Sequence, residues 1–264
     1  MSAYIYEELT KEELRVLRNK KTIILLSFGS IEQHSTHLPV GTDFLCSFRR
    51  VKSIADKTES IVFAPLQLGF SYNHRGMFGT VSLLPETMLK IVTEILDQLC
   101  DQGWKRMILF SGHAGNWNIL ELAKTKTKEK FKNAEILLAR GPFLPQEQKM
   151  ERYLRHLDLH AGKIETAIWD YYFPRTLDYS TIPQGNTALP SIIKKLSAKK
   201  KYDYIDMMLL QAILPQHTEL ISNTGAWGID TPKDYKMLPI KKAMNEYESF
   251  YVKLIKRWNS LIRK

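Results

Sequence analysis

Short apolar runs alternate with segments of helical periodicity along the first half of the chain. Runs rich in Ile, Val, Leu and Phe predict buried strands at Thr22–Ser27, Ser60–Leu66, Arg106–Phe110 and Ala134–Ala139. The segments between them predict helices at Phe44–Lys57, Pro85–Gln102 and Trp117–Lys132. Because strands alternate with helices, the pattern indicates an α/β fold with a mainly parallel sheet and helices on both faces.

The second half of the chain has a less regular pattern. We expect a helix at Ala161–Tyr172, a loop rich in Pro, Gly, Asn and Thr at Leu177–Ser191, and a helix at Tyr202–Leu214. Apolar residues at helical spacing across Ile240–Ile262 predict one long amphipathic helix that packs on the sheet. The chain shows no internal repeat and no interdomain linker, so we expect a single domain over residues 1–264.

Composition and charge exclude several classes of function. The net charge of +10 comes largely from lysines that read as solvated surface, among them Lys194–Lys195 and Lys199–Lys201, and no nucleic-acid module accompanies them. No apolar stretch approaches the length of a membrane span, and the N-terminus lacks a secretory pattern. Cys46 and Cys100 form no metal-type pair. We therefore expect a cytoplasmic protein without nucleic-acid or membrane partners.

A cluster of potential metal ligands follows the first predicted strand. The segment Gly29–Asp43 reads GSIEQHSTHLPVGTD, and it brings Glu32, His34, His37 and Asp43 into a dozen residues. Glu32 and His34 are two residues apart, so in an extended segment their side chains leave the same side. Polar loop residues that cap the next helix would explain Asp43 but not the histidines. Oxygen and nitrogen ligands at the end of a buried strand favour a catalytic metal site.

Two further motifs lie at the end of a predicted strand and at a predicted helix start. Ser111–Asn116 reads SGHAGN, which places His113 at a strand's carboxyl end; it lacks the pattern of a phosphate-binding loop, so we interpret His113 as a ligand. His160–Thr166 reads HAGKIET. Its Glu165 is either a salt-bridged core residue or a ligand, and its His160 is a helix cap, a supporting group or an acid/base.

A glycine-punctuated loop after the second strand lies at the same predicted edge of the sheet. It spans Gly69–Thr80 and contains His74 and Arg75, which either contact the substrate or belong to a structural turn.

These motifs, in this order and spacing, resemble those of the creatininase (creatinine amidohydrolase) family over about residues 20–235. The resemblance implies a three-layer α/β/α sandwich and two divalent metal ions, Zn, Mn or Fe. It also implies hydrolysis of a C–N bond, in a homo-oligomer that is often a hexamer. His160 matches a catalytic histidine. The residues that match metal ligands, with Asp43 as the bridge, are Glu32, His34, Asp43, His113 and Glu165.

The chain departs from the family pattern near the expected substrate. Gly115 stands where creatininase carries a Glu, so Glu165 is the expected replacement ligand, and Ser35-Thr36 replaces a common Gly-Pro. His37 is expected outside the ligand set. The predicted function is a metal-dependent amidohydrolase that uses metal-activated water on a cyclic or linear small-molecule amide. The departures near the substrate argue against creatinine itself as that amide. Alternatives are a metallopeptidase or formamide hydrolase of cofactor maturation, and a non-catalytic metal-binding family member.

Overall fold

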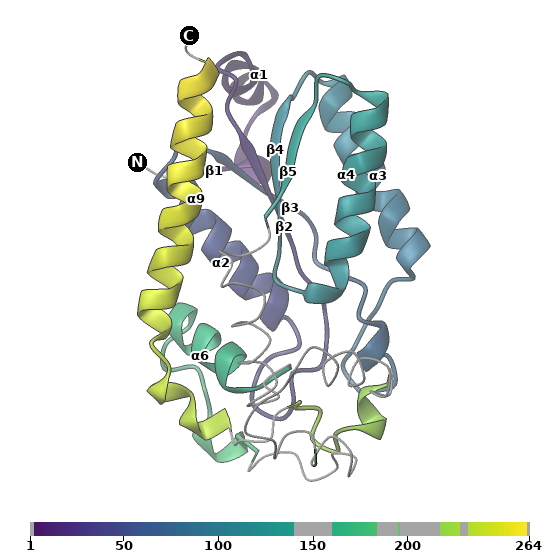
Figure 1. Cartoon of the computed structure of the whole chain (residues 1–264), viewed down its shortest axis with the longest axis vertical. Helices are drawn as coiled ribbons and strands as arrows, with labels where there is room; N and C mark the ends of the chain where they lie inside the picture. The colour runs from purple at the N-terminus through teal and green to yellow at the C-terminus, as the bar shows by residue number, and fades with distance from the viewer. Residues whose placement is uncertain (1–2, 140–159, 184–194, 196–216, 228–231, 263–264) are drawn as a thin grey trace.

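A parallel β-sheet lies between two layers of helices (Figure 1). The structure is a computed structural model that describes residues 3–139, 160–183, 195, 217–227 and 232–262. Its strands are β1 (Tyr4–Ile5), β2 (Ile24–Phe28), β3 (Ile61–Leu66), β4 (Arg106–Ser111) and β5 (Glu135–Leu138). Its α-helices include α1 (Lys11–Asn19), α2 (Thr42–Asp56), α3 (Pro85–Asp101), α4 (Trp117–Lys130), α6 (Lys163–Tyr172) and α9 (Ile240–Ile262). The predicted three-layer α/β/α architecture is confirmed.

The order of the strands creates a crevice at one edge of the sheet. The order is β1-β3-β2-β4-β5 and all pairs are parallel. From the central strand β2 the chain first adds β3 on one side and later β4 on the other. The loops that leave β2 and β4 therefore diverge, which is the usual place for a ligand in an open α/β sheet. Phe28 pairs with Ser111, so both loops start at the same level.

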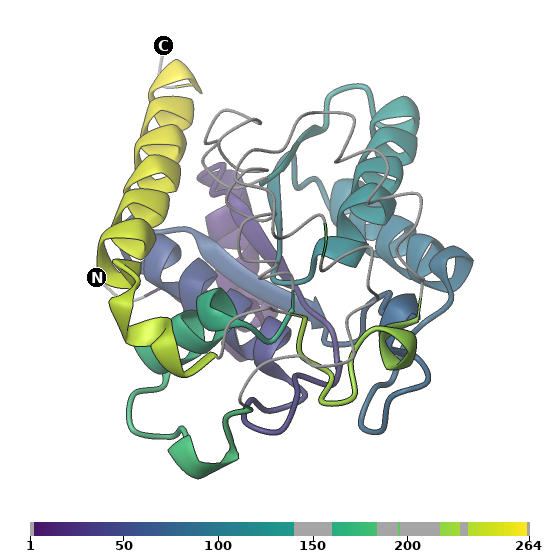
Figure 2. The ribbon, with the colours of Figure 1, turned by 60° about the horizontal axis from the view of Figure 1, so that its bottom comes forward.

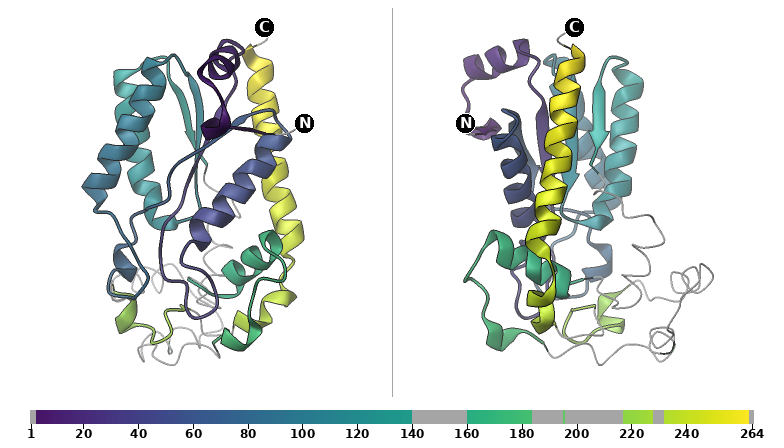
Figure 3. Two further views of the ribbon diagram at one scale, coloured as in Figure 1. Left: turned by 180° about the vertical axis from the view of Figure 1, so that it is seen from behind. Right: turned by 60° about the vertical axis from the view of Figure 1, so that its left-hand side comes forward.

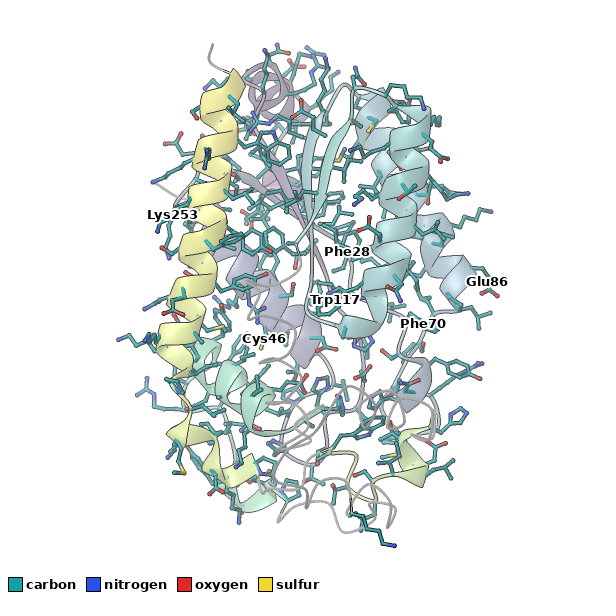
Figure 4. The ribbon with its side chains drawn as sticks, in the orientation of Figure 1. Phe28, Cys46, Phe70, Glu86, Trp117 and Lys253 are labelled. Carbon is teal, nitrogen blue, oxygen red and sulfur yellow. The ribbon has the colours of Figure 1, made fainter. Side chains whose placement is uncertain are left out.

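Alternate residues of the strands pack on opposite helical layers. On one face, Ile24 and Leu26 belong to the cluster that includes buried residues of α3 and α4. On the other face, Ile23 and Leu25 belong to the cluster that includes buried residues of α2 and α9. Figure 3 shows α9 lying along the sheet, and in Figure 4 its Lys253 points away from the core. The amphipathic C-terminal helix that the pattern predicted is thus confirmed as a core-packing helix.

The structure corrects several details of the predicted elements. Helix α6 begins at Lys163, two residues later than predicted, because Ala161 has a left-handed backbone with φ of 49°. The short strand β1 and helix α1 were not predicted, although Thr10 and Glu13 form a capping box that marks the start of α1. The predicted helix Tyr202–Leu214 lies outside the described residues, as does the predicted loop beyond residue 183. None of the described helices is both long and apolar enough to cross a membrane.

Candidate metal centre

The predicted ligands converge at the carboxyl end of the sheet, which Figure 2 turns toward the reader. Glu32 and His34 come from the loop after β2, and Asp43 comes from the first turn of α2. His113 follows β4, and Glu165 lies in the first turn of α6. Glu32, His34 and Asp43 are buried, with exposures of 1%, 0% and 6%, whereas His113 and Glu165 are partly buried at the pocket side. Five residues that are far apart in the sequence therefore meet in one buried cluster.

Asp43 stands at the centre of the cluster. Its Oδ1 lies 3.4 Å from His34 Nε2, and its Oδ2 lies 3.2 Å from His113 Nδ1. The Ser30 hydroxyl donates to Oδ2 at 2.6 Å, which fixes the orientation of the carboxylate. The two oxygens of Asp43 therefore face two different histidines.

Among the described residues, three groups of ligand atoms are close enough to surround a cation, each with its atoms within 4.8 Å of one another. Two of these groups share Asp43; one adds Glu32 and His113 to it, and the other adds His34 and Glu165. The third group joins Glu32 and His34 to His160. The structure thus brings together all five predicted ligands and adds His160 to the residues that could hold a metal.

Backbone carbonyls determine which nitrogen each of three histidines presents to the cluster. His34 Nδ1 donates to the Glu32 carbonyl and His113 Nε2 donates to the Phe70 carbonyl, both at 2.9 Å. His160 Nε2 donates to the Gln33 carbonyl at 2.6 Å. Because a carbonyl can only accept a hydrogen bond, the nitrogen that faces it carries the proton. The other nitrogen of each ring lies near a carboxylate of the cluster. Metal-binding histidines characteristically donate their second N–H in this way.

The electrostatics of the cluster favour bound positive charge. Burial lowers the pKa of His34, but the neighbouring carboxylates, Asp43 foremost, raise it to about 10. Burial also lowers the pKa of His113, but Glu32 and Asp43 outweigh it and raise that pKa to about 9. Burial raises the pKa of Glu32, and it raises that of Glu165 to about 7. Glu32 Oε2 and His34 Nε2 are buried without a hydrogen-bond partner. A divalent cation would satisfy both atoms, so the donor set fits a metal.

Two other predicted site residues differ in their placement. His74 is buried, and its Nε2 lies 3.4 Å from Glu32 Oε1. Burial, together with the nearby histidines, lowers its pKa to about 3, so its ring is neutral. Arg75 is exposed and does not line the pocket described below. His37, expected outside the ligand set, bonds through Nε2 to the Thr166 hydroxyl at 2.8 Å.

Two polar residues that the sequence analysis did not single out hold the loops of the site together. The amide nitrogen of Gln33 lies 2.8 Å from His74 Nδ1 and donates to the Gly225 carbonyl at 3.1 Å. Asn116 is fully buried; it donates to the Gly29 carbonyl and accepts from the Phe70 amide. Both residues belong to the motifs that carried the ligands, and this is the signal that could have found them.

The backbone around position 115 explains sterically why a glycine stands there. A Cβ at this position would lie 2.5 Å from His113 Nε2 and from the Phe70 carbonyl oxygen, the two atoms that bond to each other. The backbone as folded has no room for the Glu that creatininase carries here, which leaves Glu165 as the carboxylate available from the other side of the cluster.

The cluster forms one wall of a pocket of about 620 Å³, as bounded by the described residues. Aromatic side chains line part of it: Phe70, Tyr72, Trp117 and Trp227. Figure 4 labels Phe70 and Trp117, which lie beyond the strand end marked by Phe28. Tyr72 and Trp117 are 36% and 37% exposed, so the mouth has an aromatic rim. The pocket is large enough for a small organic ligand beside the candidate ligands.

Comparison with known proteins identifies the family. The sequence model of the creatininase family, described as creatinine amidohydrolase, matches residues 7–235. The chain belongs to the creatininase family. Curated relatives are hydrolases. The 3-dehydro-scyllo-inosose hydrolase of Thermotoga maritima is 26% identical over 134 residues, which are 50% of this chain and 43% of that protein. The match therefore spans less than half of that relative.

Two other relatives have different printed activities. The mycofactocin precursor peptide peptidase of Mycolicibacterium smegmatis is 24% identical over 66% of this chain and 67% of its own length. The creatinine amidohydrolase of Pseudomonas putida is 25% identical over 69% of this chain and 76% of its own length. Family membership thus establishes that the chain is related to hydrolases. It does not determine which bond the chain would cleave.

Solved creatininases share the fold. A crystal structure of creatinine amidohydrolase superposes with a TM-score of 0.67 at 17% identity and covers 99% of this chain and 97% of that one. Similar solved creatininases include a manganese form, with a TM-score of 0.66, and a Zn–Zn form of a mutant, with a TM-score of 0.67; their identities to this chain are 17% and 18%.

Proposed function

We propose that this creatininase-family chain is a metal-dependent amidohydrolase that cleaves a C–N bond of a cyclic or linear small-molecule amide. The observation that carries the proposal is the set of three histidines that each donate one N–H to a backbone carbonyl and aim the other nitrogen at carboxylates. The residues proposed to hold two divalent cations are Glu32, His34, Asp43, His113 and Glu165.

The mixed oxygen and nitrogen donor set suits Zn²⁺, Mn²⁺ or Fe²⁺ and contains no thiolate. The manganese and zinc forms of solved creatininases support the first two. When bound, a pair of such cations supplies Lewis acidity toward the amide carbonyl and lowers the pKa of water. The chain's own part is to hold the ligand atoms in place. Asp43 does this through Ser30, and His113 does it through the Phe70 carbonyl.

His160 is the proposed catalytic histidine. His160 lines the pocket; its Nδ1 lies 3.2 Å from Glu32 Oε1, while its Nε2 donates to the Gln33 carbonyl. Burial and the neighbouring His34 lower the pKa of His160 well below its usual value, so the ring is neutral and Nδ1 is free to accept. Its proposed role is to carry a proton transiently at Nδ1; the lowered pKa opposes uptake of that proton but favours its release to a leaving nitrogen. His74, which lines the pocket beside Glu32, is proposed to contact the substrate. Arg75 is exposed and outside the pocket lining, and its contact with substrate stays a prediction.

Peptide cleavage is the second candidate. It is favoured by the peptidase relatives and by the half-exposed Tyr72 and Trp117 at the mouth, which could accommodate a chain longer than a cyclic amide. Assembly into a homo-oligomer and a cytoplasmic location stay predictions.

Metal analysis combined with an activity screen tests the proposal. We expect purified protein to carry about two divalent ions per chain by elemental analysis, and Glu32→Gln to lose metal because it removes a carboxylate from the shared cluster. The screen covers cyclic amides, formamides and short peptides; turnover of peptides alone would select the second candidate. The metallohydrolase proposal would be overturned if the purified protein carried no divalent metal and the Glu32→Gln variant had the same metal content as the wild type. Metal without turnover on the whole panel would point to a non-catalytic family member.

A further inference from the structure

A basic side chain lines the same pocket at a distance from the candidate ligands. Asp43, Cys46 and Arg50 all line it, and they occupy positions i, i+3 and i+7 of α2. That spacing places them in one stripe along the helix. At 1.5 Å of rise per residue, Arg50 lies about 10 Å along the axis from Asp43. The pocket thus extends along α2 from the metal end to a guanidinium group.

The Arg50 guanidinium has no acidic partner in the described part of the chain. Its Nε is buried without a hydrogen-bond partner. Glu248 of α9, a buried acid on the helix packed beside α2, is instead held by Lys57 at 2.6 Å and Ser53 at 2.7 Å. The guanidinium lies 5.0 Å from the centre of the Tyr247 ring. The guanidinium hydrogen-bonds to the phenols of Tyr172 and Tyr247. Burial lowers the pKa of Arg50, but these two residues raise it by more than burial lowers it, so the charge is retained.

The pocket wall between the two charged ends is apolar. Cys46 lies between Asp43 and Arg50 on α2, and Ile164 and Ile168 of the neighbouring helix α6 also line the pocket. Burial raises the pKa of the Cys46 thiol to about 12, so that residue adds no charge at neutral pH. A ligand that complements this pocket therefore carries its amide at the metal end, a short apolar linker, and a negative group at the far end.

We propose that Arg50 is a specificity residue that binds a carboxylate or a phosphate at the end of the substrate remote from the scissile C–N bond. The inference rests on the proposed metallohydrolase function, since the metal centre defines the other end of the ligand. A guanidinium presents a planar fork of donors that matches either anion in a bidentate manner. Within the described residues, the Arg50 guanidinium bonds only to phenols and its Nε is unbonded, so its charge has no negative partner there, which favours an anionic ligand. The competing role is purely structural: packing on the Tyr247 ring and hydrogen bonding to the Tyr172 and Tyr247 phenols.

Bifunctional hydroxamates provide the probe. The hydroxamate end chelates a metal pair, and the tail reaches along the pocket. We would measure, on the Zn²⁺-loaded protein by calorimetry, the monohydroxamates of glutaric and adipic acid, the phosphonate analogue of the glutaric compound, and the matched neutral methyl esters. We expect the preferred anionic tail to bind about 10- to 100-fold more tightly than its ester, the range for hydrogen bonds to a charged group. The carboxylate and phosphonate arms tell the two anions apart.

Variants of Arg50 separate recognition from packing. Arg50→Met keeps the apolar stem on Tyr247 and should abolish the preference for the anionic tail while the ester binds as before; Arg50→Lys should keep part of it. Arg49→Met, an exposed neighbour on the same helix, is the matched control and should keep the whole preference. If the wild-type protein binds ester and anion equally, or if the preference survives in Arg50→Met, the proposed role of Arg50 is overturned and the metal centre is not affected. Metal-loaded protein that binds no hydroxamate overturns the metal centre and the inference with it.

Discussion

Replacing Glu32 by Gln should stabilise the metal-free protein and destabilise the metal-loaded protein relative to wild type. Glu32 is 1% exposed, and its Oε2 has no hydrogen-bond partner. Burial raises the pKa of this carboxyl in the folded state. A raised pKa means that the folded chain disfavours the ionised form, so at neutral pH the charge of Glu32 opposes folding. Gln keeps the shape of the side chain and removes the charge.

The size of the effect follows from the unpaired atom. Leaving a buried polar group unsatisfied costs about 1–3 kcal/mol, and an amide donor at position 32 could instead bond to His160 Nδ1, which now lies 3.2 Å from Glu32 Oε1. For a chain of this size, 1 kcal/mol moves the melting temperature by about 2–4 °C. Metal-free Glu32→Gln should therefore melt roughly 2–12 °C above the metal-free wild type.

Added metal should reverse this order. A cation that binds only the folded state stabilises it by about 2.7 kcal/mol when its free concentration is 100 times the dissociation constant. Glu32→Gln gains less from the same metal because it lacks one ligand carboxylate. Thermal unfolding of both proteins, after chelation and again in excess Zn²⁺ or Mn²⁺, gives the four melting temperatures that the argument needs.

The reasoning would be refuted by a Glu32→Gln variant that is less stable than wild type without metal, since Glu32 would then be an adequately paired structural residue. A wild-type protein whose melting temperature does not respond to either metal would refute it as well. Glu94→Gln, at an exposed position of α3, removes the same charge far from the cluster and should leave all melting temperatures within about 1–2 °C, as expected for a surface substitution.

Three further predictions concern the support of the site, the core and a thiol. Thr166→Val leaves the buried Nε2 of His37 without its partner and should lower the free energy of unfolding by about 1–3 kcal/mol in urea, with metal content unchanged; lost metal would contradict a purely structural role of the His37–Thr166 contact. Leu96→Ala, in the α3 layer of the core, should cost about 2–5 kcal/mol, and a cost under about 1 kcal/mol would contradict that packing. Burial, with Asp97, raises the pKa of Cys100 to about 11, so its alkylation by iodoacetamide, followed by peptide mass spectrometry, should accelerate about tenfold per pH unit from pH 8 to 10 rather than level off near pH 9.

Periodicity and motif position were enough to predict most of the architecture. Apolar runs at Thr22–Ser27 and Arg106–Phe110 correspond to β2 and β4, because a strand covered on both faces must be apolar throughout. The helix across Ile240–Ile262 has its predicted bounds, since its apolar stripe has one face of the sheet to cover. Helix α1 was missed because its signal is a two-residue capping box rather than a long periodic segment.

The sequence by itself determined which chemistry collects at one end of the sheet. Glu32, His34 and His113 follow strands that run parallel, and parallel strands end at the same edge, so position in the chain predicts proximity in space. Their residue types already predict a site for metal.

Only the tertiary structure decided how those groups face one another. The nitrogen that His113 offers is set by the carbonyl of Phe70, which lies 43 residues away in the chain, and the placement of Arg50 in the pocket is set by the direction of α2 toward α6 and α9. Periodicity along a chain specifies which face of an element is buried. It contains no information on which atom of another loop will meet that face, because such contacts depend on how separate elements pack.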